Sequence, residues 1–172
     1  MMRLRHYSKH SLFALFFSLF FLLSGCALQL APSYDKAVVD GLNSVNTDSM
    51  TLLASVANGT QASDFNNRSA QYAAVIGKLD SLAILAGARP MPKNKVSDAV
   101  NAYLEKRGVS TLNDDTNSIP SANAIKKISE TLAKMRDTDQ KQGVTGFEVR
   151  AFKGQATIYF DQAITYENFL QR

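Results

Sequence analysis

Tryptophan is absent from this sequence of 172 residues, and cysteine and histidine are scarce: Cys26, His6 and His10 are their only examples. A Ser-His-Asp triad and a Cys-His pair both need an imidazole base, so neither can form within residues 11–172. Zinc and most transition metals lose their usual ligands there, and one cysteine makes no disulfide within a chain. The sequence therefore predicts a non-enzymatic protein without metal or cofactor, stabilised by packing alone.

Positive and negative charges are nearly balanced over most of the chain. The 19 basic and 15 acidic residues give a net charge of +4. Three of the basic residues, Arg3, Arg5 and Lys9, lie within the first 25 positions, which hold no acidic residue, so residues 26–172 carry only +1. The basic character belongs to the amino-terminal segment, and no nucleic-acid partner is predicted.

One long apolar run is present, from Leu12 to Leu23, and Ser24-Gly25-Cys26 follows it directly. A basic head, a short apolar middle and a small-residue end are typical of a secretory signal peptide. The run is too short to span ~30 Å of hydrocarbon, which takes about 20 residues. The ending Leu23-Ser24-Gly25-Cys26 resembles the lipobox of bacterial lipoproteins.

That resemblance implies cleavage after residue 25 and acylation of Cys26, first on the thiol by a diacylglycerol and then on the amino group by a fatty acid such as palmitate. Cys26 would then anchor the protein in a membrane of the cell envelope. In enteric-type bacteria an Asp after this cysteine favours retention at the inner membrane; Ala27 stands here, which implies the periplasmic face of the outer membrane in a diderm host. Residues 26–32 are the lipidated cysteine and a short tether, of which the six residues 27–32 reach at most ~20 Å. Residues 33–172 suffice for one domain.

Apolar residues recur at helical spacing over most of that domain, which predicts an all-α fold. We expect an up-down bundle of four long helices and one short helix. The long helices are predicted at residues 34–58, 64–86, 121–142 and 146 to the carboxyl terminus, and the short one at residues 95–107. Ser33 and Ser63 are the expected N-caps of the first two, and Gly59 and Gly143 the expected helix ends.

The last helix has the clearest local pattern. Thr145 and Glu148 fit a capping box, and Val144 with Val149 fits a hydrophobic staple around it. Seven residues of this helix follow a strict heptad spacing that predicts its buried face: Val149, Phe152, Ala156, Tyr159, Ala163, Tyr166 and Leu170.

Two glycines and two aspartates raise questions of function within the expected helices. Gly41 and Gly77 each cost ~1 kcal/mol relative to Ala in a helix interior, and such glycines often permit close helix approach. Asp137 and Asp139 are predicted to be surface charges beside Arg136 and Lys141, although paired carboxylates could in principle serve acid–base chemistry.

A basic loop is the candidate membrane contact. Counting up-and-down helices away from Cys26 brings residues 88–95 back towards the lipid and points the turn at residues 59–63 away. The loop carries Arg89, Lys93 and Lys95 and no acidic residue. Each basic residue near anionic headgroups contributes ~1 kcal/mol, less as salt rises. The alternative is a solvated loop that has no role at the membrane.

These patterns favour a membrane-anchored envelope protein that acts as a helical interaction or structural module with an envelope protein partner. The alternative is a bundle that binds a small apolar or lipid-like ligand in its interior. An enzyme using Ser, Lys or carboxylates ranks last, since no motif places a nucleophile beside a base.

Overall fold

The computed structural model describes residues 31–90, 106 and 119–171, which all belong to one compact unit, Ala31–Arg172. In this part of the chain four long helices form the all-α fold that the sequence predicts: α2 (Lys36–Ser55), α3 (Asn66–Gly87), α5 (Pro120–Gln142) and α6 (Gly146–Leu170). A single 3₁₀ turn, η1 (Ala62–Asp64), precedes α3. The predicted short helix at residues 95–107 lies outside the described residues, apart from Lys106.

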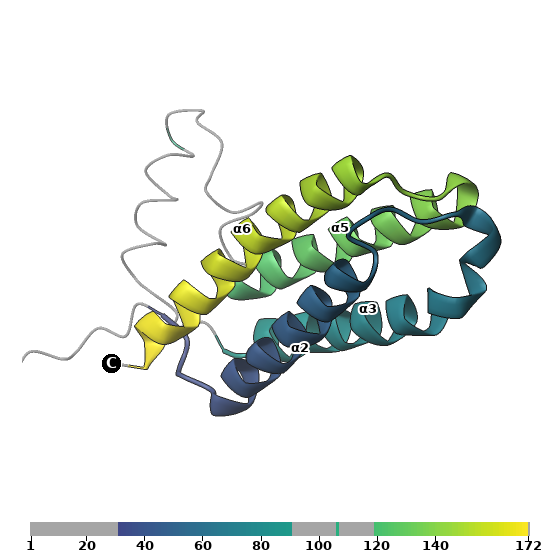
Figure 1. The fold of residues 1–172 in the computed structure, drawn as a ribbon. Coiled ribbons are helices and arrows are strands. Elements are labelled where there is room, and N and C mark those ends of the chain that lie inside the picture. Colours follow the sequence, from purple (N-terminus) through teal and green to yellow (C-terminus); the bar gives the residue numbers. More distant parts are fainter. Residues whose placement is uncertain (1–30, 91–105, 107–118, 172) are drawn as a thin grey trace, which may run out of the picture. The chain divides into compact units, whose positions relative to one another are not determined.

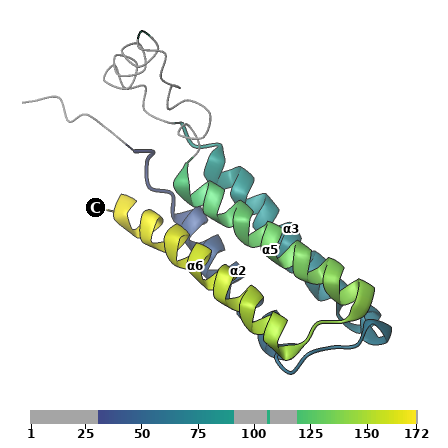
Figure 2. The ribbon, with the colours of Figure 1, turned by 90° about the horizontal axis from the view of Figure 1, so that it is seen from above.

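The helices run alternately up and down, and each packs against its neighbours in a closed ring of α2, α3, α5 and α6 (Figure 1). The start of α2 and the end of α6 lie at one end of the bundle, and the α2–α3 and α5–α6 turns lie together at the other (Figure 2). We call these the terminal end and the turn end. None of the described helices is long and apolar enough to cross a membrane.

The core is formed by the apolar faces of all four helices. Its buried residues include Val38, Leu42 and Leu52 of α2, Tyr72 and Leu79 of α3, Ile125, Ile128, Leu132 and Met135 of α5, and Val149, Ala156, Phe160 and Ala163 of α6. Every buried side-chain polar atom in the described residues has a hydrogen-bond partner. The buried polar groups of this part of the chain are therefore satisfied, as in native cores generally.

The α5–α6 hairpin has the local structure that its sequence predicts. The Thr145 hydroxyl accepts a hydrogen bond from the Glu148 N–H at 3.2 Å, and the Glu148 carboxylate accepts one from the Thr145 N–H at 2.8 Å. These bonds lower the pKa of Glu148, chiefly through the backbone N–H of Thr145. Val144 and Val149 are both buried. The capping box is confirmed.

Two predicted N-caps are wrong. Asp35, not Ser33, caps α2, because its carboxylate accepts from the Ala37 N–H at 2.8 Å. Ser63 lies inside the 3₁₀ turn, and α3 starts after Phe65 without a side-chain cap. Local sequence marked the region of each helix start but not its residue, which is usual for helix ends.

The buried face of α6 also departs from the heptad. Phe160 and Glu167 are 2% and 0% exposed, whereas Tyr159 and Tyr166 are only half-buried. A straight helix drifts ~20° per heptad, so the face towards the core moves from Tyr159 to Phe160 and from Tyr166 to Glu167. Of the predicted heptad residues, Val149, Ala156 and Ala163 are buried. The other four are half-buried, and two of these, Phe152 and Tyr159, pack against the core.

Candidate functional site

A buried ion pair joins the helices at the turn end. Asp139 of α5 is fully buried and accepts hydrogen bonds from Arg68 Nε and Nη2 of α3, both at 2.5 Å. Thr60 donates to it from the α2–α3 connection, and the Tyr72 hydroxyl donates from α3 at 3.2 Å. Burial raises the pKa of Asp139, but the bonds from Arg68 and Thr60 outweigh that effect and leave the pKa below its ordinary value.

The same cluster binds the two turns to each other. The Thr60 N–H donates to the Val144 carbonyl at 2.7 Å, and the Val144 N–H donates to the Thr60 hydroxyl at 3.0 Å. Gly59 and Gly143, at φ 95° and 79°, let the two backbones approach where a side chain would collide. The prediction that Asp139 is a surface charge is wrong: its oxygens are satisfied by three residues, one from the α2–α3 connection and two from α3. Asp137 does lie at the surface, beside Arg136.

A second buried ion pair joins the terminal end. Arg89, just after α3, donates from Nη1 and Nη2 to the two carboxylate oxygens of Glu167 on α6, at 2.8 and 2.5 Å. The Ser121 hydroxyl of α5 also donates to Glu167, and the Arg89 guanidinium reaches the Ser33 carbonyl before α2. Residues within or next to all four helices therefore meet around the Arg89–Glu167 pair. Arginine is the side chain best suited to such bidentate pairing with a carboxylate.

This pairing corrects the predicted membrane loop. The side chain of Arg89 is 6% exposed and its charge is neutralised by Glu167, so it presents nothing to a headgroup. The Arg89 side chain follows the end of α3 and folds back into the bundle to pair with the buried carboxylate of Glu167. The composition of the loop alone does not predict this pairing. Lys93 and Lys95, and the lipidation site Cys26, lie outside the described residues.

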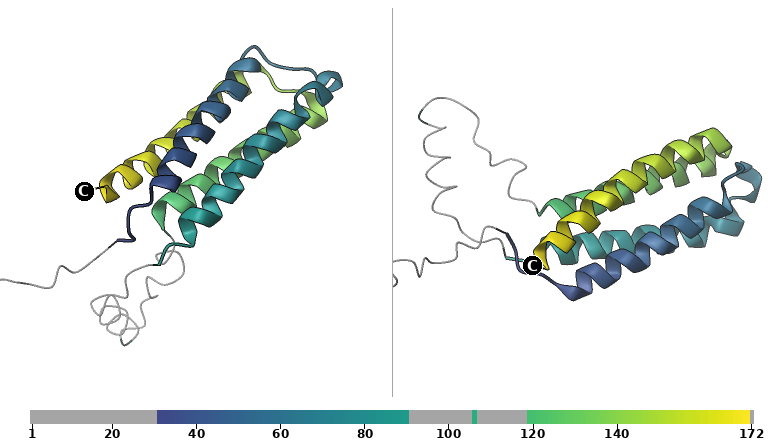
Figure 3. Two further views of the ribbon diagram at one scale, coloured as in Figure 1. Left: turned by 90° about the horizontal axis from the view of Figure 1, so that it is seen from below. Right: turned by 60° about the vertical axis from the view of Figure 1, so that its left-hand side comes forward.

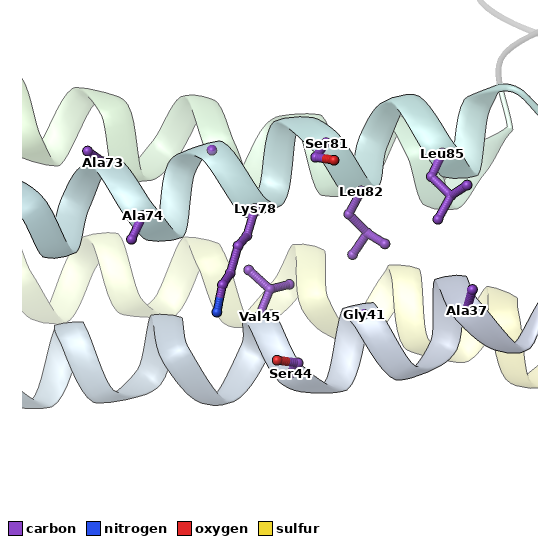
Figure 4. Close-up of a pocket in the computed structure, with 11 residues that line it drawn as sticks. Ala37, Gly41, Ser44, Val45, Ala73, Ala74, Lys78, Ser81, Leu82 and Leu85 are labelled. Atoms are coloured by element: carbon purple, nitrogen blue, oxygen red, sulfur yellow. The ribbon is translucent and has the colours of Figure 1, made fainter.

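An open groove runs along the bundle between α2 and α3 (Figure 4). Its volume is about 590 Å³. Val45 and Leu82 form its floor, and small, exposed side chains form most of its walls. The wall residues are Ala37, Gly41 and Ser44 from α2, and Ala73, Ala74, Gly77 and Ser81 from α3.

The two helix glycines of this groove behave differently. A Cβ at Gly41 would lie 2.8 Å from Leu82 Cδ1, so an alanine there would require the end of the Leu82 side chain to shift. A Cβ at Gly77 would meet nothing within 4 Å. A glycine in a helix interior costs ~1 kcal/mol relative to alanine. At Gly41 the packing of Leu82 offsets this cost, whereas at Gly77 no described residue packs against the glycine.

One ion pair crosses the groove. Lys78 of α3 donates to Asp48 of α2 at 2.7 Å and separates the main groove from a smaller hollow of about 170 Å³ on its other side. Both side chains are substantially exposed, at 58% and 38%. Such a pair contributes only about 0–1 kcal/mol, so it can open without loss of the fold.

The chemistry of the groove is that of a contact surface. Apart from Lys78, its polar side chains are the hydroxyls of Ser44 and Ser81 (Figure 4). No group of three or more metal-ligating side chains occurs in the described residues. The sequence shows that Gly77 lies in the middle of a helix. It does not show that this side of the helix is exposed, because Ala, Ser and Gly contribute little to the hydrophobic periodicity.

Figure 3 (left) shows α2 and α3 side by side in the bundle, seen from below. The faces that line the groove carry mostly small residues, whereas the core cluster is made largely of bigger apolar side chains. The fold and this groove are what the chain itself shows: no protein-family model, curated protein or solved structure matches it.

Proposed function

We propose that this protein is a non-enzymatic lipoprotein, anchored in a membrane of the cell envelope through Cys26, whose bundle binds a helix of an envelope protein partner in the α2–α3 groove. The anchor is supported by the basic head, the short apolar run and the ending Leu23-Ser24-Gly25-Cys26. The outer membrane is the proposed location, supported by Ala27.

The observation that carries the binding role is the open space beside Gly77. Apolar helices pack at 8–10 Å between axes, and small residues at the contact bring the backbones to the shorter distance. Small residues face the groove three or four positions apart on both helices, as in Ala37 and Gly41 or Gly77 and Ser81. A third helix laid in the groove would bury these positions and Leu85, which is 43% exposed.

A small apolar ligand is the second candidate, since 590 Å³ lies within the range of ligand pockets, about 300–1,000 Å³. Buried apolar residues from all four helices occupy the bundle interior, so we place such a ligand in the groove. Ligand pockets enclose most of their ligand, whereas this groove is open along its length. A helix of a partner protein fits an open groove better, because its remaining surface can stay exposed or contact the rest of the partner.

The test is site-specific photo-crosslinking of the full chain in its native membrane. A photoreactive residue replaces Ala74 in the groove, and a matched one replaces Lys134, which is exposed on α5. We expect one discrete protein adduct from position 74, mapped by mass spectrometry to a helical segment of an envelope protein, and none from position 134. Equal adducts from both positions, or a lipid adduct from position 74, would overturn the helix-binding role. An adduct to residues 91–118 of the same chain would do so too.

A further inference from the structure

The charges outside the two buried ion pairs are divided between two sides of the bundle. In the closed ring of helices, α2 and α3 form one side, and α5 and α6 form the opposite side (Figure 3, right). Residues 31–90, which contain α2 and α3, hold two basic and five acidic residues besides the buried pairs, a net charge of −3. Residues 119–171, which contain α5 and α6, hold seven basic and four acidic ones, a net charge of +3. The α5–α6 side is therefore the basic side.

A row of lysines lies on the outer surface of α5, next to α6. Lys127, Lys134 and Lys141 are exposed and follow one another at seven-residue intervals. Ser129 of α5 donates to Asp80 of α3 at 2.5 Å, which marks the side of α5 that faces α3. The three lysines lie about 120–160° around the helix from Ser129 at 100° per residue. Since α6 is the other neighbour of α5 in the ring, the lysine row borders α6.

An apolar line runs along the outer surface of α6. Phe147, Ile158 and Phe169 are 74%, 59% and 59% exposed, and we call them the outer stripe. They follow one another at 11-residue intervals, and 3.67 residues per turn is close to the repeat of an unstrained helix, so the line is straight. Ala151 and Gly154, both exposed, lie between the first two. Phe169 also takes part in another interaction of this chain and keeps that exposure.

The edge of the stripe away from the lysine row carries a cation as well. Gly146 marks the edge towards α2, because a Cβ there would lie 3.0 Å from the Ala57 carbonyl oxygen. Arg150 follows four residues later on this edge, and its guanidinium carbon lies 6.0 Å from the centroid of the Phe147 ring. Basic side chains therefore flank the stripe on both edges.

Three acidic residues also lie beside the stripe, and all are included in the net charge of +3. The Glu148 carboxylate is bonded to Thr145 in the capping box. Glu130 is paired with Lys127 at 2.9 Å. Asp161 is exposed on the edge towards α2. The surface thus combines an apolar centre with borders that are basic on balance.

These features together fit the surface of an anionic membrane. Exposed apolar residues with a polar rim mark a protein or membrane contact. At a membrane the apolar side chains lie below the headgroups, and lysine and arginine keep their charged ends among the phosphates. Two copies of this side would each bring a net charge of +3 to a shared contact, which opposes self-association through it.

We propose that the α5–α6 side rests on an anionic membrane surface, with the outer stripe inserted among the headgroups. The proposal rests on the proposed anchor at Cys26, which holds the bundle at such a surface, and goes beyond the binding role of the groove. The tether of ~20 Å is long enough, because α2 is next to α6 in the ring and one helix is about 10–12 Å wide.

The bundle then lies along the membrane, in contrast to the upright bundle that the sequence favours. Its α2–α3 groove is on the far side, open to a partner. In the crosslinking experiment on the groove, a photoreactive residue at position 134 should contact lipid and no protein. The protein adduct from position 74 does not depend on this orientation.

Fluorescence quenching by a lipid-borne quencher tests the orientation in the full lipidated chain. One chain carries a label through Gln162→Cys, which is exposed on α6 and leaves the outer stripe intact; a matched chain carries it through Ala70→Cys, exposed on α3. In vesicles of phosphatidylcholine and phosphatidylglycerol, quenching should be several-fold stronger at position 162 than at position 70. The difference should shrink in phosphatidylcholine alone and with added salt, which screens the charges.

Both labels share the same attachment to the vesicle, so their comparison reports the orientation whatever holds the chain there. Intact mass of each chain reports the lipid on Cys26 separately. A failure of the orientation is thereby distinguished from a failure of the anchor.

Charge variants test why this side is chosen. Lys134→Gln with Lys141→Gln removes two charges from the basic side, and Lys36→Gln with Lys78→Gln removes two from the other side as the matched control. All four lysines are exposed, so circular dichroism should show unchanged helix content. The first pair should reduce quenching at position 162 several-fold, and the control pair should leave it unchanged. Equal quenching at positions 162 and 70, or equal effects of the two pairs, would overturn the proposal.

Discussion

Asparagine in place of Asp139 tests whether the turn end depends on a buried charge. The carboxylate accepts two bonds from Arg68, one from Thr60 and one from Tyr72, and it is fully buried. An asparagine is nearly the same size, but its NH₂ group is a donor that would face the donors of Arg68. It also leaves the guanidinium, 12% exposed, without a counter-charge.

Removing one partner of a buried ion pair costs about 3–5 kcal/mol. For a domain of this size 1 kcal/mol corresponds to ~3 °C in Tm, so Asp139→Asn should lower Tm by about 9–15 °C. The free energy of unfolding, measured by urea denaturation, should fall by the same 3–5 kcal/mol with an unchanged m-value.

Asp137→Asn is the matched control, since it removes the same charge two residues away. Asp137 is 64% exposed and pairs with its neighbour Arg136, so we expect a change within ~0.5 kcal/mol. Equal Tm shifts for the two variants would refute the reasoning, because they would show that the buried network contributes no more than a surface pair.

Further variants test the pH dependence, the cap, the glycines and the anchor. Since the pKa of Asp139 lies below its ordinary value in the folded state, its contribution is present above pH ~4 and is lost as the pH falls through the folded pKa; acid titration of Asp139→Asn should show a smaller loss of stability than that of the unsubstituted chain. Thr145→Ala should lower the free energy of unfolding by ~1 kcal/mol, and an unchanged Tm would contradict the role of the capping box. Gly77→Ala should raise stability by up to ~1 kcal/mol, whereas Gly41→Ala should gain less or lose stability because of Leu82; equal gains in thermal melts would show that the two sites do not differ. Cys26→Ser should give an unlipidated product by intact mass, and retention of the lipid mass shift would disprove the proposed anchor.

The sequence predicts the helices well because their faces repeat many times. A long apolar face survives an error at one position, so α2, α3, α5 and α6 fall close to their predicted ranges. The α5–α6 hairpin is predicted to the residue, since Gly143, Thr145 and Glu148 act within a few positions of one another. Local chemistry of that kind does not depend on the rest of the fold.

The buried ion pairs could not be predicted, because each joins residues far apart in sequence. Arg68 and Asp139 are separated by 71 positions, and Arg89 and Glu167 by 78. A charged residue in a helix pattern usually marks the exposed side, so the sequence predicts Asp139 at the surface and does not single out Glu167. The one sequence clue was that Glu167 lies four residues after the buried Ala163, on the same face.

The α2–α3 groove is visible in the sequence only as two glycines. Gly41 and Gly77 looked alike, and only the packing shows that Leu82 fills the space at one and nothing described fills it at the other. This difference is why Gly77, and not Gly41, is the useful position for testing the binding role.

The central claim, that the groove binds a partner helix, is tested most directly by the yield of the position-74 crosslink in two Gly77 variants. Gly77→Ala adds one methyl group and leaves most of the groove open; Gly77→Leu places a large side chain in its middle, and the Cβ of either residue meets nothing within 4 Å. Both should fold at least as stably as the unsubstituted chain, since both residues favour helix over glycine. We predict that the alanine variant keeps the adduct and the leucine variant loses it. An adduct of equal yield in the leucine variant would contradict the account.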